Sequence, residues 1–148
     1  MMKETNFWII LIPIWGETHI NMCADFILPA LLAPDNIPYL SKHDSVTIRF
    51  LTTELSSRYL QNNNVCKKIS NFANISYIFI DDLVSLGEYG LTLTMAYERG
   101  IQTDAPELQV KQSYIFLNGD MVTSNNTFRT IHDKIKSGYS AVVSPGVR

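Results

Sequence analysis

The stretch SYIFLNGDMVTSNNTF, Ser113 to Phe128, contains an apolar run that stops abruptly at a polar turn. Residues 114–117 read YIFL, which is typical of a strand that is buried on both faces. Asn118, Gly119 and Asp120 follow directly. A carboxylate pinned between buried segments is costly without a partner, so Asp120 indicates a functional position. A simple turn residue after Gly119 is the alternative interpretation.

Similar runs recur along the chain and alternate with helical patterns. Helices are predicted to begin near Ile20, Thr53, Leu86 and Phe128, because apolar residues recur there at helical spacing. This alternation implies a mostly parallel sheet of about five strands with right-handed crossovers. We therefore expect an α/β fold, a Rossmann-like three-layer α/β/α sandwich formed by residues 1–148 as a single domain. The predicted strands are residues 7–14, 46–51, 75–80, 114–117 and 140–144.

Local signals set the expected limits of the helices. Pro29 should kink or end the first helix. Thr53 could cap the second, and Gly138 is a natural stop for the last. The second helix either breaks at the asparagines of residues 62–64 or continues to Phe72, and the pattern leaves both open.

The composition and the apolar run of residues 7–15 argue against a nucleic-acid-binding, membrane-spanning or secreted protein. The formal net charge is −2, so no basic field recruits nucleic acid. Cys23 and Cys66 lie outside any CxxC spacing and are interpreted as reduced core residues, which favours a cytoplasmic location. Residues 7–15 are too short to span a bilayer. Glu4 before this run and the polar residues 16–19 after it argue against a signal peptide.

Polar residues gather at the predicted carboxyl ends of the strands, where ligands bind in parallel sheets. Several carboxylates on one rim would repel an anion unless a divalent cation lay between them, so we expect a phosphate compound bound with Mg²⁺ or Mn²⁺. Helix capping remains the alternative for the two adjacent aspartates, and a core position for Trp15. The strand ends carry Trp15, Gly16 and Glu17, then Glu54, then Asp81 and Asp82, then Asn118 and Asp120, with Arg148 after the fifth strand.

Several α/β classes lack their motif here. No GxGxxG follows the first strand, and neither a GxxxxGK[ST] loop nor a GxSxG elbow occurs. A receiver-type domain would need paired acids after the first strand, which instead ends in Trp-Gly-Glu. A nucleotidyltransferase would carry a Gly-rich, Lys-bearing loop there, and only Gly16 is present.

The stretch IFLNGDMVTSNNTFRTIHDKIKSGYSAVV, residues 115–143, resembles the metal-binding strand and following helix of GT-A-fold glycosyltransferases. In that family the strand ends in an Asp-x-Asp motif, and Asn118-Gly119-Asp120 lies in its place. Residues 95–101, MAYERGI, are similar to the helix that precedes this strand, and FWIILIPIWGE, residues 7–17, looks like the first strand.

The resemblance implies transfer of a sugar from a nucleotide diphosphate donor to an acceptor that the sequence does not identify. Asp120 would bind Mn²⁺ or Mg²⁺, and no catalytic residue is assigned. The implied contacts to the nucleotide sugar come from Trp15, Gly16, Glu17, Asp81, Asp82, Asn118 and Arg148.

Two departures from the family pattern support an alternative. Asn118 replaces the leading aspartate, which should lower metal affinity. The chain also stops soon after the fifth predicted strand, so residues 1–148 would be a donor-binding part that is truncated before the acceptor site. A non-catalytic nucleotide-binding or protein-interaction module of the same fold is therefore the second hypothesis.

Overall fold

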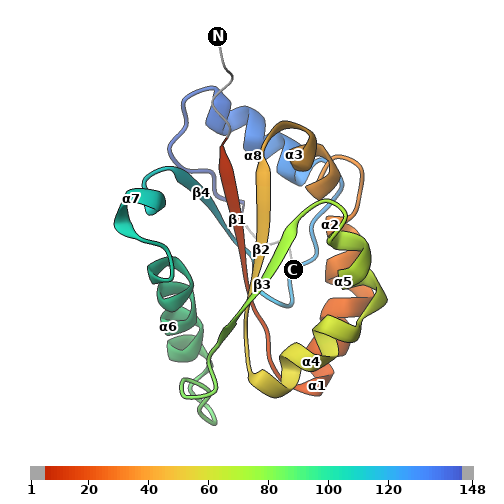
Figure 1. Cartoon of the computed structure of the whole chain (residues 1–148), viewed down its shortest axis with the longest axis vertical. Coiled ribbons are helices and arrows are strands. Elements are labelled where there is room, and N and C mark those ends of the chain that lie inside the picture. The colour runs from red at the N-terminus through yellow and green to blue at the C-terminus, as the bar shows by residue number, and fades with distance from the viewer. Residues whose placement is uncertain (1–5, 145–148) are drawn as a thin grey trace.

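Four parallel strands form the central sheet in the order β3-β2-β1-β4 (Figure 1). The structure is a computed structural model that describes residues 6–144. In the register of the sheet, Ile9 of β1 lies between Thr47 of β2 and Tyr114 of β4. The strands are β1 (Phe7–Pro13), β2 (Ser45–Thr52), β3 (Asn74–Phe79) and β4 (Gln112–Phe116).

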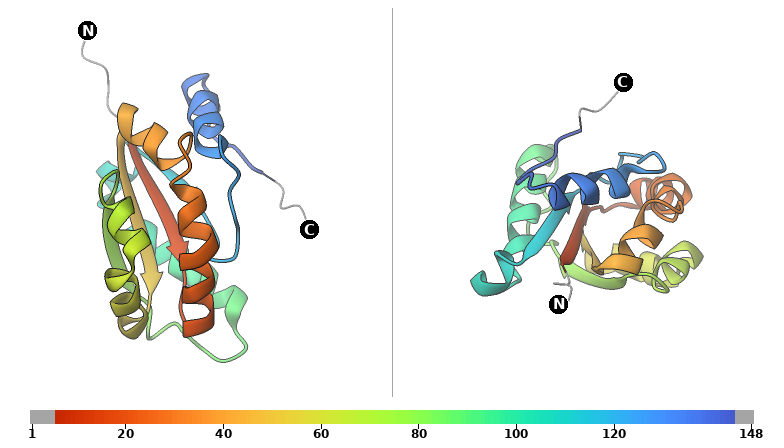
Figure 2. Two further views of the ribbon diagram at one scale, coloured as in Figure 1. Left: turned by 90° about the vertical axis from the view of Figure 1, so that its right-hand side faces the viewer. Right: turned by 90° about the horizontal axis from the view of Figure 1, so that it is seen from above.

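Helices cover both faces of the sheet, so the three-layer α/β/α prediction is confirmed (Figures 1 and 2). One face carries α1 (Glu17–Met22), the π-helical turn η1 (Cys23–Ile27), α2 (Leu28–Leu31), α3 (Ile37–His43), α4 (Glu54–Asn62), α5 (Asn64–Ile69) and α8 (Thr127–Lys136). The other face is covered by α6 (Tyr89–Gln102), and α7 (Pro106–Gln109) leads from α6 into β4.

Side chains of β1 alternate between two hydrophobic clusters, because successive residues of a strand point to opposite faces. Trp8, Ile10 and Ile12 belong to the larger cluster beneath α1–α5 and α8. Ile9 and Leu11 belong to the smaller cluster beneath α6. This double burial explains why the strand reads as an unbroken apolar run.

The predicted fifth strand is wrong. Residues 140–144 form no strand and pair with none of the described strands, and Val143 is 88% exposed. A β-branched run becomes a strand only where it finds cross-strand neighbours, and this segment leaves the edge of β4 unpaired. The sheet of residues 6–144 therefore has four strands.

Side-chain caps set the starts of α4 and α5, and one of the two caps was predicted from the sequence. Thr53 caps α4, since its hydroxyl accepts a hydrogen bond from the Ser56 N–H at 3.2 Å. The asparagine run breaks the helix, because the Asn63 side chain caps α5 through the Val65 N–H at 2.8 Å. The first helix passes Pro29 and ends at Leu31, after widening into the π-turn η1. Leu86 lies before α6, and α3 and α7 were not predicted.

A buried ion pair ties β2 to the end of α6. The Arg49 guanidinium donates to both Asp104 oxygens, at 2.8 and 3.0 Å, and to the Gly100 carbonyl at 2.6 Å. The Tyr114 hydroxyl of β4 donates to the same Asp104 carboxylate. The pair therefore fixes α6 against the sheet.

Two further expectations concern residues away from the strand ends. Cys23 and Cys66 are buried free thiols, and burial raises their pKa values to about 12 and about 11, which fits core residues.

Within residues 6–144, no helix has the length and apolar character needed to cross a membrane.

Candidate functional site

The candidate site lies at the carboxyl ends of β1 and β4, the two strands between which the strand order of the sheet reverses. From β1 the chain passes through helices on one face to β2 and β3, and from β3 it passes through α6 on the opposite face to β4. The carboxyl ends of β1 and β4 are therefore neighbours, and the strand order reverses between these two strands. Such a topological switch point leaves a crevice, and ligands of open α/β sheets bind there.

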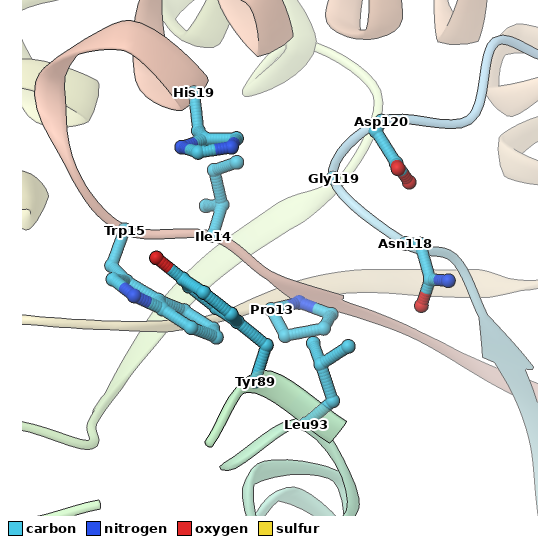
Figure 3. A pocket seen from close by; sticks show the side chains of 9 residues that line it. All are labelled: Pro13, Ile14, Trp15, His19, Tyr89, Leu93, Asn118, Gly119 and Asp120. Atoms are coloured by element: carbon cyan, nitrogen blue, oxygen red, sulfur yellow. The ribbon is translucent and has the colours of Figure 1, made fainter. Parts of the chain in front are cut away.

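A pocket of about 230 Å³ occupies this crevice (Figure 3). It brings together three of the residues that the sequence assigned to the site, namely Trp15 after β1 and Asn118 and Asp120 after β4. The other residues that line it are Pro13, Ile14, His19, Tyr89, Leu93 and Gly119.

Gly119 allows the two strand ends to approach each other. A Cβ atom at this position would lie 2.5 Å from Ile14 Cδ1 and 2.9 Å from the Pro13 carbonyl oxygen. Real Cβ atoms essentially never lie so close to other atoms, so any other residue between Asn118 and Asp120 would force the two strand ends to shift. The Asn-Gly-Asp sequence thus places two polar side chains at the pocket on a backbone that packs directly against β1.

Asn118 is held by α6. Its Oδ1 accepts a hydrogen bond from the Tyr97 hydroxyl at 2.7 Å. Burial and the neighbouring charge of Asp120 raise the pKa of Tyr97 to about 12, so the hydroxyl keeps its proton at neutral pH. Asp120 is exposed at the mouth of the pocket, and Met121 and Val122 after it are exposed too, so the expectation that this carboxylate is pinned between buried segments is wrong.

Two aromatic rings form the wall opposite these polar residues (Figure 3). Trp15 and Tyr89 lie nearly parallel, with ring centroids 6.4 Å apart and an angle of 15° between the planes. Tyr89 is the first residue of α6 and is 56% exposed. Trp15 is partly buried and packs against the smaller hydrophobic cluster, and parallel rings of this kind offer a stacking surface for another planar group.

The segment after Asp120 is anchored by a fully buried asparagine. The Asn36 amide donates to the Ser124 carbonyl at 3.0 Å, and its oxygen accepts from the Phe128 N–H at 3.0 Å. Asn36 therefore fixes the path from β4 to α8 and, with it, the place of Asp120.

Two other residues of the first strand end do not line the pocket. Gly16 adopts a positive φ of 81° at the start of α1, and its N–H donates to the Ser56 hydroxyl at 3.3 Å. Glu17 is exposed in the first turn of α1. His19, two residues further along α1, is exposed and lines the pocket.

The two aspartates after β3 have structural partners and do not line the pocket. Asp81 accepts from the Glu54 N–H at 3.0 Å, which joins the start of α4 to the end of β3. Asp82 pairs with Arg99 at 2.6 and 2.7 Å, and the hydrogen bonds from Arg99 lower the pKa of Asp82. The capping alternative therefore describes Asp81 better than a ligand contact. Arg148 lies outside the described residues.

The described residues do not form a site that would hold a metal ion in the absence of a ligand. Within residues 6–144, no group of three or more His, Cys, Asp or Glu side chains is placed to hold a metal ion. Among the described residues that line the pocket, Asp120 is the one carboxylate, and Asn118 adds one neutral amide oxygen. Mg²⁺ often binds through one or two carboxylates together with substrate phosphates, so these residues suit only a cation that arrives with its ligand.

Comparison with known structures matches the fold to the crystal structure of mouse xyloside xylosyltransferase 1 in its apo form, with a TM-score of 0.58. The fold of this chain is GT-A-like. The match covers 90% of this chain and 50% of that chain, so the chain spans half the length of the matched protein, at 13% sequence identity. No protein-family model and no curated protein matches the sequence.

Proposed function

We propose that this chain binds a nucleoside diphosphate sugar between β1 and β4, as the donor-binding part of a glycosyltransferase. The observation that carries the proposal is the pocket at the switch point of a GT-A-like fold, with an aromatic wall facing Asn118 and Asp120. Trp15 and Tyr89 would stack on the base, and Asn118 and Asp120 would face the ribose and the diphosphate.

The size of the pocket sets how much of the ligand it can enclose. Sites for small ligands usually measure about 300–1,000 Å³. A volume of about 230 Å³ suits the nucleoside portion, with the diphosphate and the sugar along the open rim beside Asp120. Among the described lining residues, His19 is the only one able to carry a positive charge. A Mg²⁺ or Mn²⁺ ion bound to the diphosphate and held by Asp120 would therefore supply the charge neutralisation.

Replacing Asp120 by alanine is expected to weaken binding of the nucleotide sugar in Mn²⁺ by about tenfold or more, because a charged hard-oxygen ligand is lost. Asp120 is exposed, so the fold should survive. Isothermal titration with nucleoside diphosphate sugars, including a xylosyl donor in view of the name of the matched protein, measures the change.

Asp25→Ala is the matched control, because Asp25 is also an exposed carboxylate, lies in η1 and does not line the pocket. It should bind the nucleotide sugar as the wild type does. Equal affinity in Asp120→Ala and Asp25→Ala would rule out the proposed role of Asp120, and absence of binding across all bases and sugars would rule out the function.

A non-catalytic module of the same fold is the second candidate. It is favoured by Asn118, a neutral side chain at the position where the family pattern has a carboxylate. This candidate predicts nucleotide binding without hydrolysis or transfer of the sugar in Mn²⁺ or Mg²⁺. Release of free nucleoside diphosphate from a bound nucleotide sugar, measured by chromatography, would exclude it.

A further inference from the structure

The contact between α3 and α8 contains a buried ionisable pair, at the end of the sheet opposite the pocket (Figure 1). The side chains of His132 on α8 and Asp44 at the end of α3 are 10% and 1% exposed. Asp44 accepts hydrogen bonds from the Trp8 indole N–H at 2.9 Å and from the Asn6 backbone N–H at 3.2 Å. Both donors are neutral, so they stabilise the carboxylate without balancing its charge.

The Asp44 carboxylate has one close counter-ion. Burial raises the pKa of Asp44, but the hydrogen bonds from Trp8 and Asn6 outweigh this effect and hold the pKa below its usual value. His132 Nε2 lies 3.4 Å from Asp44 Oδ2, and among residues 6–144 no other cationic group lies within 4 Å of this carboxylate. Lys136 is exposed and acts on Asp44 from beyond ion-pair distance. A buried carboxylate without a paired charge is costly, so a proton on His132 should stabilise this contact.

The His132 ring has a carboxylate beside each of its nitrogens. Nδ1 lies 3.4 Å from Oδ1 of Asp133, which is exposed. Nε2 is buried on the side of Asp44 and has no well-aligned hydrogen bond within residues 6–144. A neutral imidazole donates from only one nitrogen, whereas an imidazolium donates from both. The surroundings of the ring therefore suit its protonated form.

Two further ionisable side chains of α3 lie against the His132 ring. Tyr39 contacts it edge-on, with centroids 5.4 Å apart, and desolvation raises the pKa of this phenol, so Tyr39 stays neutral. His43 is exposed at 5.6 Å and would repel an imidazolium only when it is itself protonated. Arg129 of α8 lies over the Tyr39 ring and pairs with Asp35 at 3.4 Å. The buried carboxylate therefore depends on the imidazole ring for a counter-charge.

We propose that His132 is a pH-dependent switch: uptake of a proton by its ring completes an ion pair with Asp44 and strengthens the packing of α8 against α3. Release of the proton leaves the carboxylate without a counter-ion and weakens this packing. Asn36 ties the start of α8 to the segment that follows Asp120, so the switch also sets how firmly that segment is held.

The sign of the pH dependence follows from this pairing. A histidine of an unfolded chain titrates near about 6.5. Because the folded protein gains an ion pair from the proton, the stabilisation is complete below that pH and is lost at higher pH, when folded His132 releases the proton. The effect is thus opposite in direction to that of a carboxylate, whose stabilisation is lost as the pH falls.

Urea denaturation at pH 5.5 and pH 8.0 compares the wild type with His132→Gln, which keeps an N–H donor and cannot take up the charge. Between these pH values the unfolding equilibrium constant of the wild type should rise by about tenfold more than that of the variant. His43→Gln is the matched control, because His43 is the exposed neighbour of the same ring, and it should keep the wild-type difference. Equal pH dependence in the wild type and His132→Gln would overturn the proposal, as would its loss in His43→Gln.

Two measurements on the wild type need no substitution and no ligand, so their outcome is independent of nucleotide binding. Nitrogen NMR of the His132 ring should show both nitrogens protonated at pH 5.5, and a neutral ring at that pH rules out the switch. Hydrogen exchange, corrected for the intrinsic effect of pH, should show severalfold weaker protection of residues 127–136 at pH 8.0 than at pH 5.5, with β1 unchanged. Uniform change across both elements would mean that the proton does not act on α8.

Discussion

Replacement of Arg49 by methionine is expected to lower the free energy of unfolding by about 3–5 kcal/mol. The Arg49 and Asp104 side chains are only 9% and 12% exposed, and they are joined by two hydrogen bonds. Removing the guanidinium leaves a buried carboxylate and the Gly100 carbonyl without their donor. Urea denaturation followed by circular dichroism at pH 7 measures the loss as a shift in the midpoint.

Arg58→Met is the matched control for this change. Arg58 forms an ion pair with Glu54 at the same 2.8 Å distance, but the two side chains are 68% and 63% exposed. Exposed pairs spaced four residues apart on a helix contribute only about 0.3–0.5 kcal/mol. The double variant Arg49→Met/Asp104→Leu should regain much of the stability, because two apolar groups replace a buried pair without leaving a charge. Equal losses in Arg49→Met and Arg58→Met would contradict this account.

The same ion pair predicts how stability depends on pH. Hydrogen bonds from Arg49 hold the pKa of Asp104 below its usual value, against the opposing effect of burial. An unfolded Asp104 titrates near the ordinary value of about 3.9. The contribution of this carboxylate is therefore complete above that pH and is lost as the pH falls through the lower folded pKa. We expect the wild type to lose stability below about pH 4, and Arg49→Met to show a smaller slope there.

The strands could be predicted because their signal is local. β1 and most of β2 are buried on both faces, whereas β3 and β4 are only partly buried, so the expectation of full burial is wrong for those two strands. Each expected range still agrees with the structure within two residues. The Thr53 cap was predictable for the same reason, since its partner Ser56 lies three residues away. Residues 140–144 have strand composition as well, but a strand also depends on a neighbour that composition does not specify.

The candidate site was predictable in part, because the switch-point rule needs the strand order. The sequence placed Trp15 and Asp120 at strand ends, and the order that makes β1 and β4 neighbours brings them to one pocket. Asp82 carried the same strand-end signal, yet its partner Arg99 lies 17 residues away on α6. Tyr89 falls within the helical pattern that begins near Leu86, and only the position of α6 over the crevice turns its ring toward Trp15.

Gly119→Ala is expected to lower the free energy of unfolding by about 1–3 kcal/mol, which is typical of overpacking at a tight contact. The new Cβ would lie 2.9 Å from the Pro13 carbonyl oxygen, and a backbone atom cannot move aside as the Ile14 methyl can. The ends of β1 and β4 must therefore separate, which moves Asn118 and Asp120 away from Trp15. Nucleotide binding should fall by about tenfold or more, since positioning errors of about 1 Å are costly.

Gly90→Ala is the matched control, because Gly90 lies in the first turn of α6 and a Cβ there would meet no atom within 4 Å. Alanine at such a position should raise stability by about 0.5–1 kcal/mol, since glycine loses more backbone entropy on folding. Gly90 also neighbours Tyr89, so this control tests whether any added methyl near the pocket disturbs binding. Wild-type denaturation midpoint and wild-type nucleotide affinity in Gly119→Ala would show that β1 and β4 do not depend on this contact to form the pocket.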